Sequence, residues 1–335
     1  MASARPPHFK LSTPRLAWLA LGANAVVILQ GALVRATGSG AGCGSYWPTC
    51  NGTVLPLSHT SESLLEFSHR LLSLAVLLLG VWLLRRAWRT RRDQPGLWAV
   101  ALAAFVFLVV EALLGGATVL LGLTGDNISV ARGLMVASHL VNSLLLVGAL
   151  ALCVLYARAY AQGAAPWPLR LERQGALGAV FLAAILGMLV LMFSGGIAAM
   201  GNTMFPAESL AAGVAADFDP GAHPLIRLRI LHPLIAIGVG VYLFVALGLA
   251  RLLKPVAAGQ GLARALLGVY LFQLALGTLN FALLAPTVLQ LLHLLTAVAA
   301  FALLVALAAL TIGSGAAAPE PARRLELRRG DRVSR

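Results

Sequence analysis

Four histidines stand inside long apolar stretches of the sequence: His69, His139, His232 and His293. A polar imidazole ring in such surroundings must find a partner, and within membrane segments such residues usually have a function. An imidazole nitrogen can bind a metal ion or the iron of haem, or it can form a structural hydrogen bond. One buried histidine leaves both interpretations open, whereas four of them favour a ligand role.

The chain that carries them is too apolar for a soluble protein. Of its 335 residues 59% are hydrophobic and 11% are charged, whereas a soluble domain is about half apolar and one quarter charged. Eight apolar segments are long enough, at roughly 20 residues, to cross a bilayer as helices: 14–34, 65–84, 97–121, 133–157, 174–194, 228–250, 263–284 and 287–310. The first has no clear small-residue cleavage site, so we interpret it as a span rather than a secretory signal. The composition predicts an all-α membrane protein with eight transmembrane helices.

Basic residues indicate the orientation of these spans. They cluster near the N-terminus, in the connections after the second, fourth and sixth spans, and in the tail, as in Arg85, Arg86, Arg89, Arg158, Arg251, Lys254, Arg323 and Arg324. Because positive residues gather on the cytoplasmic side, both termini are expected to be cytoplasmic. The net charge of +13 is then a topology signal, and its scatter over short loops argues against nucleic-acid binding. Residues 313–335 are expected to form a disordered basic tail lying on anionic lipid.

The two halves of the chain resemble each other. Glu111-Ala-Leu-Leu-Gly115 matches Gln273-Leu-Ala-Leu-Gly277, and Gly31 matches Gly195 or Gly196. The histidines repeat at similar intervals and in the same order. We therefore expect two similar four-helix bundles related by an axis along the membrane normal, one at 1–160 and one at 174–312. Glu111 is interpreted as a residue that forms a structural hydrogen bond, with a proton path as the alternative.

The even-numbered spans run in the same direction and carry all four histidines at similar depths. Each histidine follows the expected outer end of its span by four to six residues, at a rise of about 1.5 Å per residue. The rings can therefore meet in pairs, and two imidazoles facing across a four-helix bundle can be the axial ligands of a haem iron. One porphyrin site is expected in each half. Zinc and copper fit less well, because their sites usually use tighter clusters or thiolates.

Glu66 makes the two pairs unlike. It precedes His69 by three residues and shares its helical face, whereas Arg229 takes the corresponding place before His232. The carboxylate can transfer protons, orient the His69 ring, or simply lie at the interface. Arg70 and Arg229 near the outer boundary are candidate partners for anionic haem propionates, with interfacial snorkelling as the alternative.

Two of the three cysteines lie in the first outer connection. Cys43 and Cys50 stand in a glycine-rich segment, and the outer compartment is oxidising, so a short-range disulfide is expected. Two free thiols are the alternative. Cys153, in the fourth span, is expected to be a small buried packing residue.

These residues resemble the haem A synthase family over nearly the whole chain, from the first span to the eighth. The most specific motifs are Thr37-Gly-Ser-Gly-Ala-Gly-Cys43 through Trp47-Pro48-Thr-Cys50, and Glu66-Phe-Ser-His69-Arg70. The chain departs from the family pattern in two ways. Pro233 follows His232 where Arg70 follows His69, and the C-terminal half lacks the cysteine pair that some relatives carry.

The resemblance implies a haem-dependent membrane oxidoreductase of the bacterial cell membrane. Family members oxidise a ring methyl group of haem O to a formyl group with molecular oxygen, which makes haem A for cytochrome oxidase. By this resemblance His69 and His139 would hold the substrate haem, and Glu66 would assist catalysis. A resident haem b would lie between His232 and His293. A haem O synthase would deliver the substrate, and the sequence identifies no electron donor.

Two other functions compete with this one. A di-haem b-type cytochrome that only transfers electrons is the main alternative, because paired histidines indicate haem rather than its chemistry. Glu66 beside only one pair distinguishes the two. A haem O synthase or another prenyltransferase needs aspartate-rich motifs for magnesium and diphosphate, and the five aspartates of this chain form no such cluster on a span.

Overall fold

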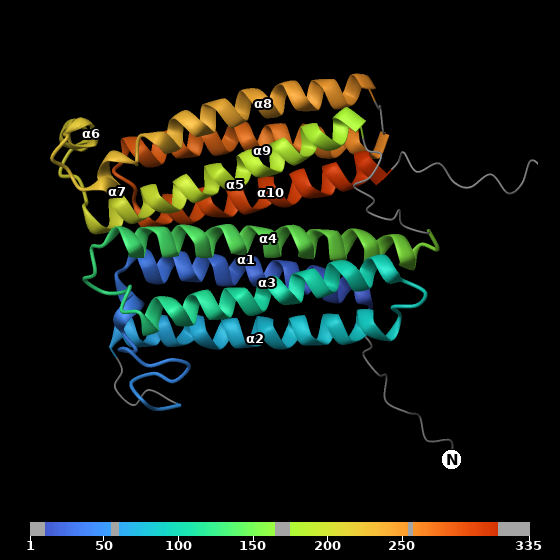
Figure 1. The fold of residues 1–335 in the computed structure, drawn as a ribbon, viewed down its shortest axis with the longest axis horizontal. Coiled ribbons are helices and arrows are strands. Elements are labelled where there is room, and N and C mark those ends of the chain that lie inside the picture. The colour runs from blue at the N-terminus through green and yellow to red at the C-terminus, as the bar shows by residue number, and fades with distance from the viewer. Residues whose placement is uncertain (1–10, 55–59, 165–174, 254–256, 314–335) are drawn as a thin grey trace, which may run out of the picture.

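The computed structural model of this chain describes residues 11–54, 60–164, 175–253 and 257–313. These parts contain eight helices long and apolar enough to cross a membrane (Figure 1): α1 (Thr13–Ala36), α2 (Ser61–Arg89), α3 (Pro95–Leu120), α4 (Val130–Ala161), α5 (Gly175–Met204), α7 (Pro224–Arg227) continued by α8 (Leu231–Leu253), α9 (Ala257–Ala282) and α10 (Thr287–Gly313). A 3-10 helix, η1 (Ser39–Ala41), and the short α6 (Leu210–Phe218) lie between spans. The predicted all-α class and the eight spans are confirmed. Of the predicted tail, 313–335, the first residue is the last of α10, and residues 314–335 lie outside the described residues.

The helices of His69 and His139 begin earlier than hydropathy predicted, because capped polar residues extend them beyond their apolar stretches. The Thr60 hydroxyl accepts a hydrogen bond from the Ser63 N–H at the start of α2, and Ser129 caps α4 in the same way. Such caps satisfy backbone donors at a helix start. His69 is therefore the ninth residue of α2 and His139 the tenth of α4. The helices start before the apolar segments, and the expected depth of the two histidines in the membrane stays a prediction.

The spans contact one another in two cycles (Figure 1). In one, α1, α2, α3 and α4 each contact the next and α4 returns to α1, and α5, α8, α9 and α10 form the other. The cycles meet where α4 packs on α5 and α10, which makes α4 the most enclosed span. Two repeated domains with limits at 1–160 and 174–312, and a cytoplasmic location for both termini, stay predictions.

Arg35, near the C-terminal end of α1, links the two cycles. Its guanidinium donates hydrogen bonds to the Ala199 carbonyl at 3.1 Å and to the Thr203 hydroxyl at 2.5 Å, both in α5. It also donates to Gln290 Oε1 of α10 at 2.7 Å. Hydrogen bonds from a charged donor are stronger than neutral ones, so this cation holds α1 against α5 and α10.

Candidate functional site

The two histidines of the C-terminal half face each other. The ring centroids of His232 in α8 and His293 in α10 are 6.2 Å apart, and the ring planes are nearly perpendicular at 85°. Two metal–nitrogen bonds of about 2 Å each, together with the half-widths of the rings, would span such a separation. The structure thus brings this pair together, and its role as a ligand pair stays a prediction.

A glycine on a neighbouring helix lies against each of the four histidine rings. A Cβ atom added to the glycine would come within 2.8–3.3 Å of the ring in every case: Gly31 with His69, Gly115 with His139, Gly195 with His232, and Gly277 with His293. Ordinary carbon contacts are about 3.5–4.0 Å, so a residue larger than glycine at these positions would press against the ring. The sequence matched Gly31 with either Gly195 or Gly196, and the structure selects Gly195, because Gly196 packs on Ala137 of α4 instead.

The four rings differ in the partners of their nitrogen atoms. His139 Nδ1 lies 2.9 Å from Glu111 Oε1, and His232 Nδ1 lies 3.1 Å from the Ser194 hydroxyl. His69 Nδ1 and His293 Nδ1 are buried without a hydrogen-bond partner in the described parts of the chain. Buried polar atoms are rarely left unpaired, and each such atom calls for an explanation such as an absent ion or cofactor. No three His, Cys, Asp or Glu side chains within the described ranges form a metal-ligand group, so the pairs can supply two ligands each.

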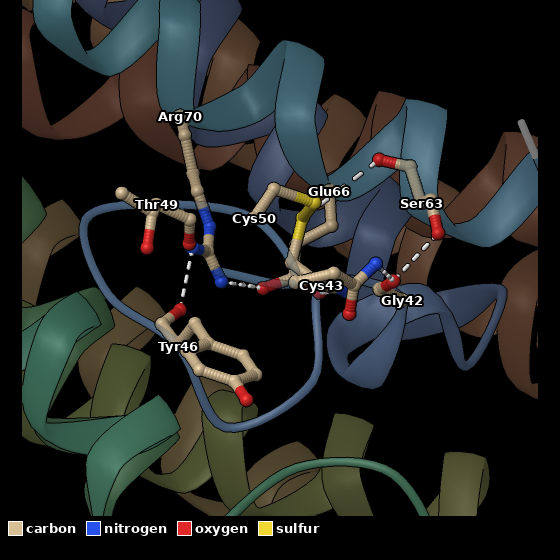
Figure 2. Close-up of polar contacts among 9 residues, drawn as sticks. Gly42, Cys43, Tyr46, Thr49, Cys50, Ser63, Glu66 and Arg70 are labelled. Atoms are coloured by element: carbon tan, nitrogen blue, oxygen red, sulfur yellow. Dashed lines mark hydrogen bonds and ion pairs between the residues drawn. A yellow bond between two sulfur atoms is a disulfide. The ribbon is translucent and has the colours of Figure 1, made fainter. Parts of the chain in front are cut away.

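The predicted disulfide between Cys43 and Cys50 is present in the loop between α1 and α2. Figure 2 shows how α2 holds this loop through Glu66 and Arg70. The Cys43 N–H donates to Glu66 Oε2 at 2.8 Å, and Glu66 Oε1 forms an ion pair with Arg70. The loop thus engages one carboxylate oxygen of the buried Glu66 side chain, and Arg70 of the same helix engages the other.

Arg70 and Ser63 complete the attachment of the loop. The Arg70 guanidinium donates to the carbonyls of Tyr46, at 2.7 Å, and Thr49, at 2.5 Å. Two turns closer to the start of α2, the Ser63 hydroxyl donates to the Gly42 carbonyl at 2.6 Å (Figure 2). Ser63, Glu66 and Arg70 on one face of α2 therefore form four hydrogen bonds with the loop.

The tip of this loop reaches α3. A Cβ atom on Gly116 would meet the Trp47 ring at 2.9 Å, so the indole packs directly on the α3 backbone there. The preceding residue, Gly115, is the one that faces His139. The disulfide loop therefore spans from the helix of His69 to the helix that packs on His139.

The outer loop of the C-terminal half is held by a different ion pair. The Arg229 guanidinium lies 2.9 Å from Asp217 Oδ1 through both Nε and NH2, and NH1 donates to Asn202 Oδ1 at 3.0 Å. Sequence reasoning gave Asp217 no role. A hollow of about 450 Å³ opens beside this contact and is lined by Asp217, Phe218, Pro224, Arg227, Leu228 and Leu231. It lies outside the histidine pair, next in sequence to His232.

Three further predicted residues, Cys153, Arg70 and Arg229, have defined surroundings in the structure. Cys153 is buried within α4, as expected for a packing residue. Arg70 and Arg229, the candidate propionate partners, both bind outer loops in this structure. Whether they also contact a propionate stays a prediction.

Comparisons with known proteins agree with the motifs. The sequence profile of the family described as "Cytochrome oxidase assembly protein" matches residues 14–305. A protein of Thermus thermophilus named "Protoheme IX farnesyltransferase" is 43% identical over 304 residues, which cover 90% of this chain and 48% of that protein.

Proteins named "Heme A synthase" match shorter segments. That of Lysinibacillus sphaericus is 42% identical over 120 residues, which cover 34% of this chain and 38% of the relative, and that of Alkalihalophilus pseudofirmus is 38% identical over 101 residues, or 29% and 33%. The chain thus spans less than half the length of each of these relatives. With eight spans and bacterial relatives, it is a multi-pass integral membrane protein. The match over residues 14–305 shows that the chain belongs to the cytochrome oxidase assembly protein family.

Proposed function

We propose that this chain is a haem A synthase, which oxidises a methyl group of haem O to a formyl group with molecular oxygen. The observation that carries the proposal is the arrangement of four histidine rings, each packed against a glycine of a neighbouring helix. The Glu66 carboxylate and the disulfide loop lie beside only the N-terminal pair. The family and the relatives named "Heme A synthase" support a role in making haem A for cytochrome oxidase.

The donor set fits haem better than a free metal ion. Each pair offers two imidazoles, and the other ligands of a metal bound there would have to come from a bound group such as a porphyrin. Two features support such a site. The Nδ1 atoms of His69 and His293 are buried without a partner in the described parts of the chain, and a glycine beside each ring leaves room for it. In the proposal His232 and His293 hold a resident haem b, and His69 and His139 hold the substrate haem. Bound haem would supply the iron at which oxygen and electrons react.

Glu66 is the residue of this chain proposed to assist the reaction. It lies one turn before His69, and among the described residues its carboxylate is the only acidic group that binds the disulfide loop. In this structure the Cys43 N–H and Arg70 hold both of its oxygens, so its proposed part in proton transfer requires one of these contacts to open. While both contacts are closed, the loop would exclude water from the substrate pair.

The farnesyltransferase name of the Thermus protein supports a partner rather than the same activity. Fewer than half of that protein's residues match this chain, and the described part of this chain shows no acidic cluster that would hold magnesium and diphosphate. We infer that a haem O synthase, which transfers a farnesyl group to haem, delivers the substrate.

The proposal is tested by expressing the chain together with a source of haem O and identifying the extracted haems. Haem A is expected with the wild type, with less or none in the Glu66→Gln variant, while Glu62→Gln, an exposed carboxylate of the same helix, behaves as the wild type. A di-haem cytochrome would bind haem and yield no haem A in any variant, and that result would refute the synthase function.

A further inference from the structure

Glu111 of α3 is a mostly buried carboxylate that has no part in the proposed reaction. Asn142 donates to its Oε2 atom at 2.5 Å, and the Ser143 hydroxyl donates to its Oε1 atom. The Asn142 amide nitrogen also donates to the Phe107 carbonyl at 2.9 Å, which fixes the orientation of the amide. Glu111 is thus held firmly against α4, the helix of His139.

The same carboxylate determines which nitrogen of His139 is available. Glu111 Oε1 lies 2.9 Å from His139 Nδ1, and a carboxylate can only accept a hydrogen bond. The proton of the neutral ring is therefore on Nδ1. Its Nε2 atom, which lies beside the Gly115 position, keeps a free lone pair for a metal.

The corresponding residue in the C-terminal half is neutral. Gln273 of α9 lies with its amide nitrogen 3.2 Å from His293 Nε2, and its Oε1 accepts a hydrogen bond from Thr296. Gln273 matches Glu111 in the repeated motif, and each reaches the histidine of the following span. The partner of His139, at Nδ1, is thus an anion that accepts a hydrogen bond, and the partner of His293, at Nε2, is an uncharged amide whose nitrogen donates one.

We propose that Glu111 is a positioning residue that presents His139 Nε2 to the N-terminal haem and makes that haem harder to reduce than the C-terminal one. The inference rests on the proposed haem sites. A carboxylate bonded to the far nitrogen of a ligating histidine fixes the ring tautomer and raises the basicity of the ligand. A more basic axial ligand and a nearby negative charge both favour the oxidised iron, and hydrogen bonding around the ligand is one of the levers that set haem potentials.

Reciprocal exchange of the two residues tests the inference in the purified, haem-loaded protein. Potentiometric titration followed by absorption should show two couples in the wild type. In Glu111→Gln the couple with the lower potential should rise and the other stay unchanged. In Gln273→Glu the other couple should fall. Affinity for one haem in Glu111→Gln should also drop, on the order of tenfold or more. Glu62→Gln removes an exposed carboxylate from α2 and should change neither couple.

A wild type with two haems whose potentials do not respond to either exchange would overturn the inference and leave the proposed function intact. A wild type that binds no haem when haem is supplied would instead overturn the proposed function. Two measurements do not depend on a loaded protein or on one variant. Nitrogen-15 spectra of labelled histidine should show His139 protonated at Nδ1, and a His139 protonated at Nε2 would refute the positioning role. If Glu111→Gln does not fold, an unchanged potential in Gln273→Glu refutes the tuning.

Discussion

Replacing Gly277 by alanine should move the His293 ring. The new Cβ atom would stand 2.8 Å from His293 Cε1 and 3.4 Å from Nδ1, against an ordinary carbon contact of about 3.5–4.0 Å. The ring or the α9 backbone must therefore give way by about 0.7 Å or more. Overpacking of this kind destabilises by about 1–3 kcal/mol, and the helix propensity of alanine offsets this by up to about 1 kcal/mol.

Gly268 on the same helix is the matched control, because a Cβ atom there meets nothing within 4 Å. We expect Gly277→Ala to be less stable to heat than Gly268→Ala by about 1–3 kcal/mol, and to retain less haem. The difference should disappear in a His293→Ala background, since the side chain that collides with the new methyl group is gone. Equal stabilities of the two alanine variants in the wild-type background would refute the assignment of Gly277 as the space for the ring.

Three further results are expected. Replacing Cys43 and Cys50 by serine should lower the free energy of unfolding by about 2.5 kcal/mol, because the eight-residue ring no longer restricts the unfolded chain. A protease should then cut the variant first within 43–50. Equal resistance of the wild type and the variant to the protease would contradict this. Asp217→Asn should destabilise by about 3 kcal/mol, because it leaves Arg229 without its anion, whereas the exposed Asp219→Asn should change thermal unfolding by less than about 0.5 kcal/mol; similar losses in both would show that the Asp217–Arg229 pair is not the cause. Arg35→Gln should lower stability by about 1.5 kcal/mol or more, because it removes charged hydrogen bonds to α5 and α10, and Arg15→Gln on the exposed face of α1 should not; an unchanged melting temperature in Arg35→Gln would refute the link.

Residue types that are rare in their surroundings were predictable from the sequence. Histidines in apolar spans and a cysteine pair in an outer loop stand out by composition alone, and the repeat correctly aligned the glycines that face the rings. It left Gly195 and Gly196 undecided, because neighbouring residues differ by about 100° around a helix, and only packing shows which one meets His232. The starts of α2 and α4 were placed too late, because the apolar segments begin after the polar capped turns that open these helices.

Contacts with the backbone could not be predicted. Arg70 binds the carbonyls of Tyr46 and Thr49, and a carbonyl carries no signature of residue type. The partner of Glu66 in the loop is likewise the N–H of Cys43. The pairing of Asp217 with Arg229 depends on the path of α6, which composition does not determine. Glu111 did give a signal, because a carboxylate in an apolar span must find donors, but its choice of His139 followed only from helix packing.

The histidine pairs are tested most directly by the haem content and absorption spectrum of the purified protein. We expect a b-type haem with two imidazole ligands in the wild type. His232→Ala and His293→Ala should each lose this haem, while His69→Ala should retain it. Variants of His232 and His293 that keep the wild-type spectrum, or a wild type that binds no haem, would contradict the account.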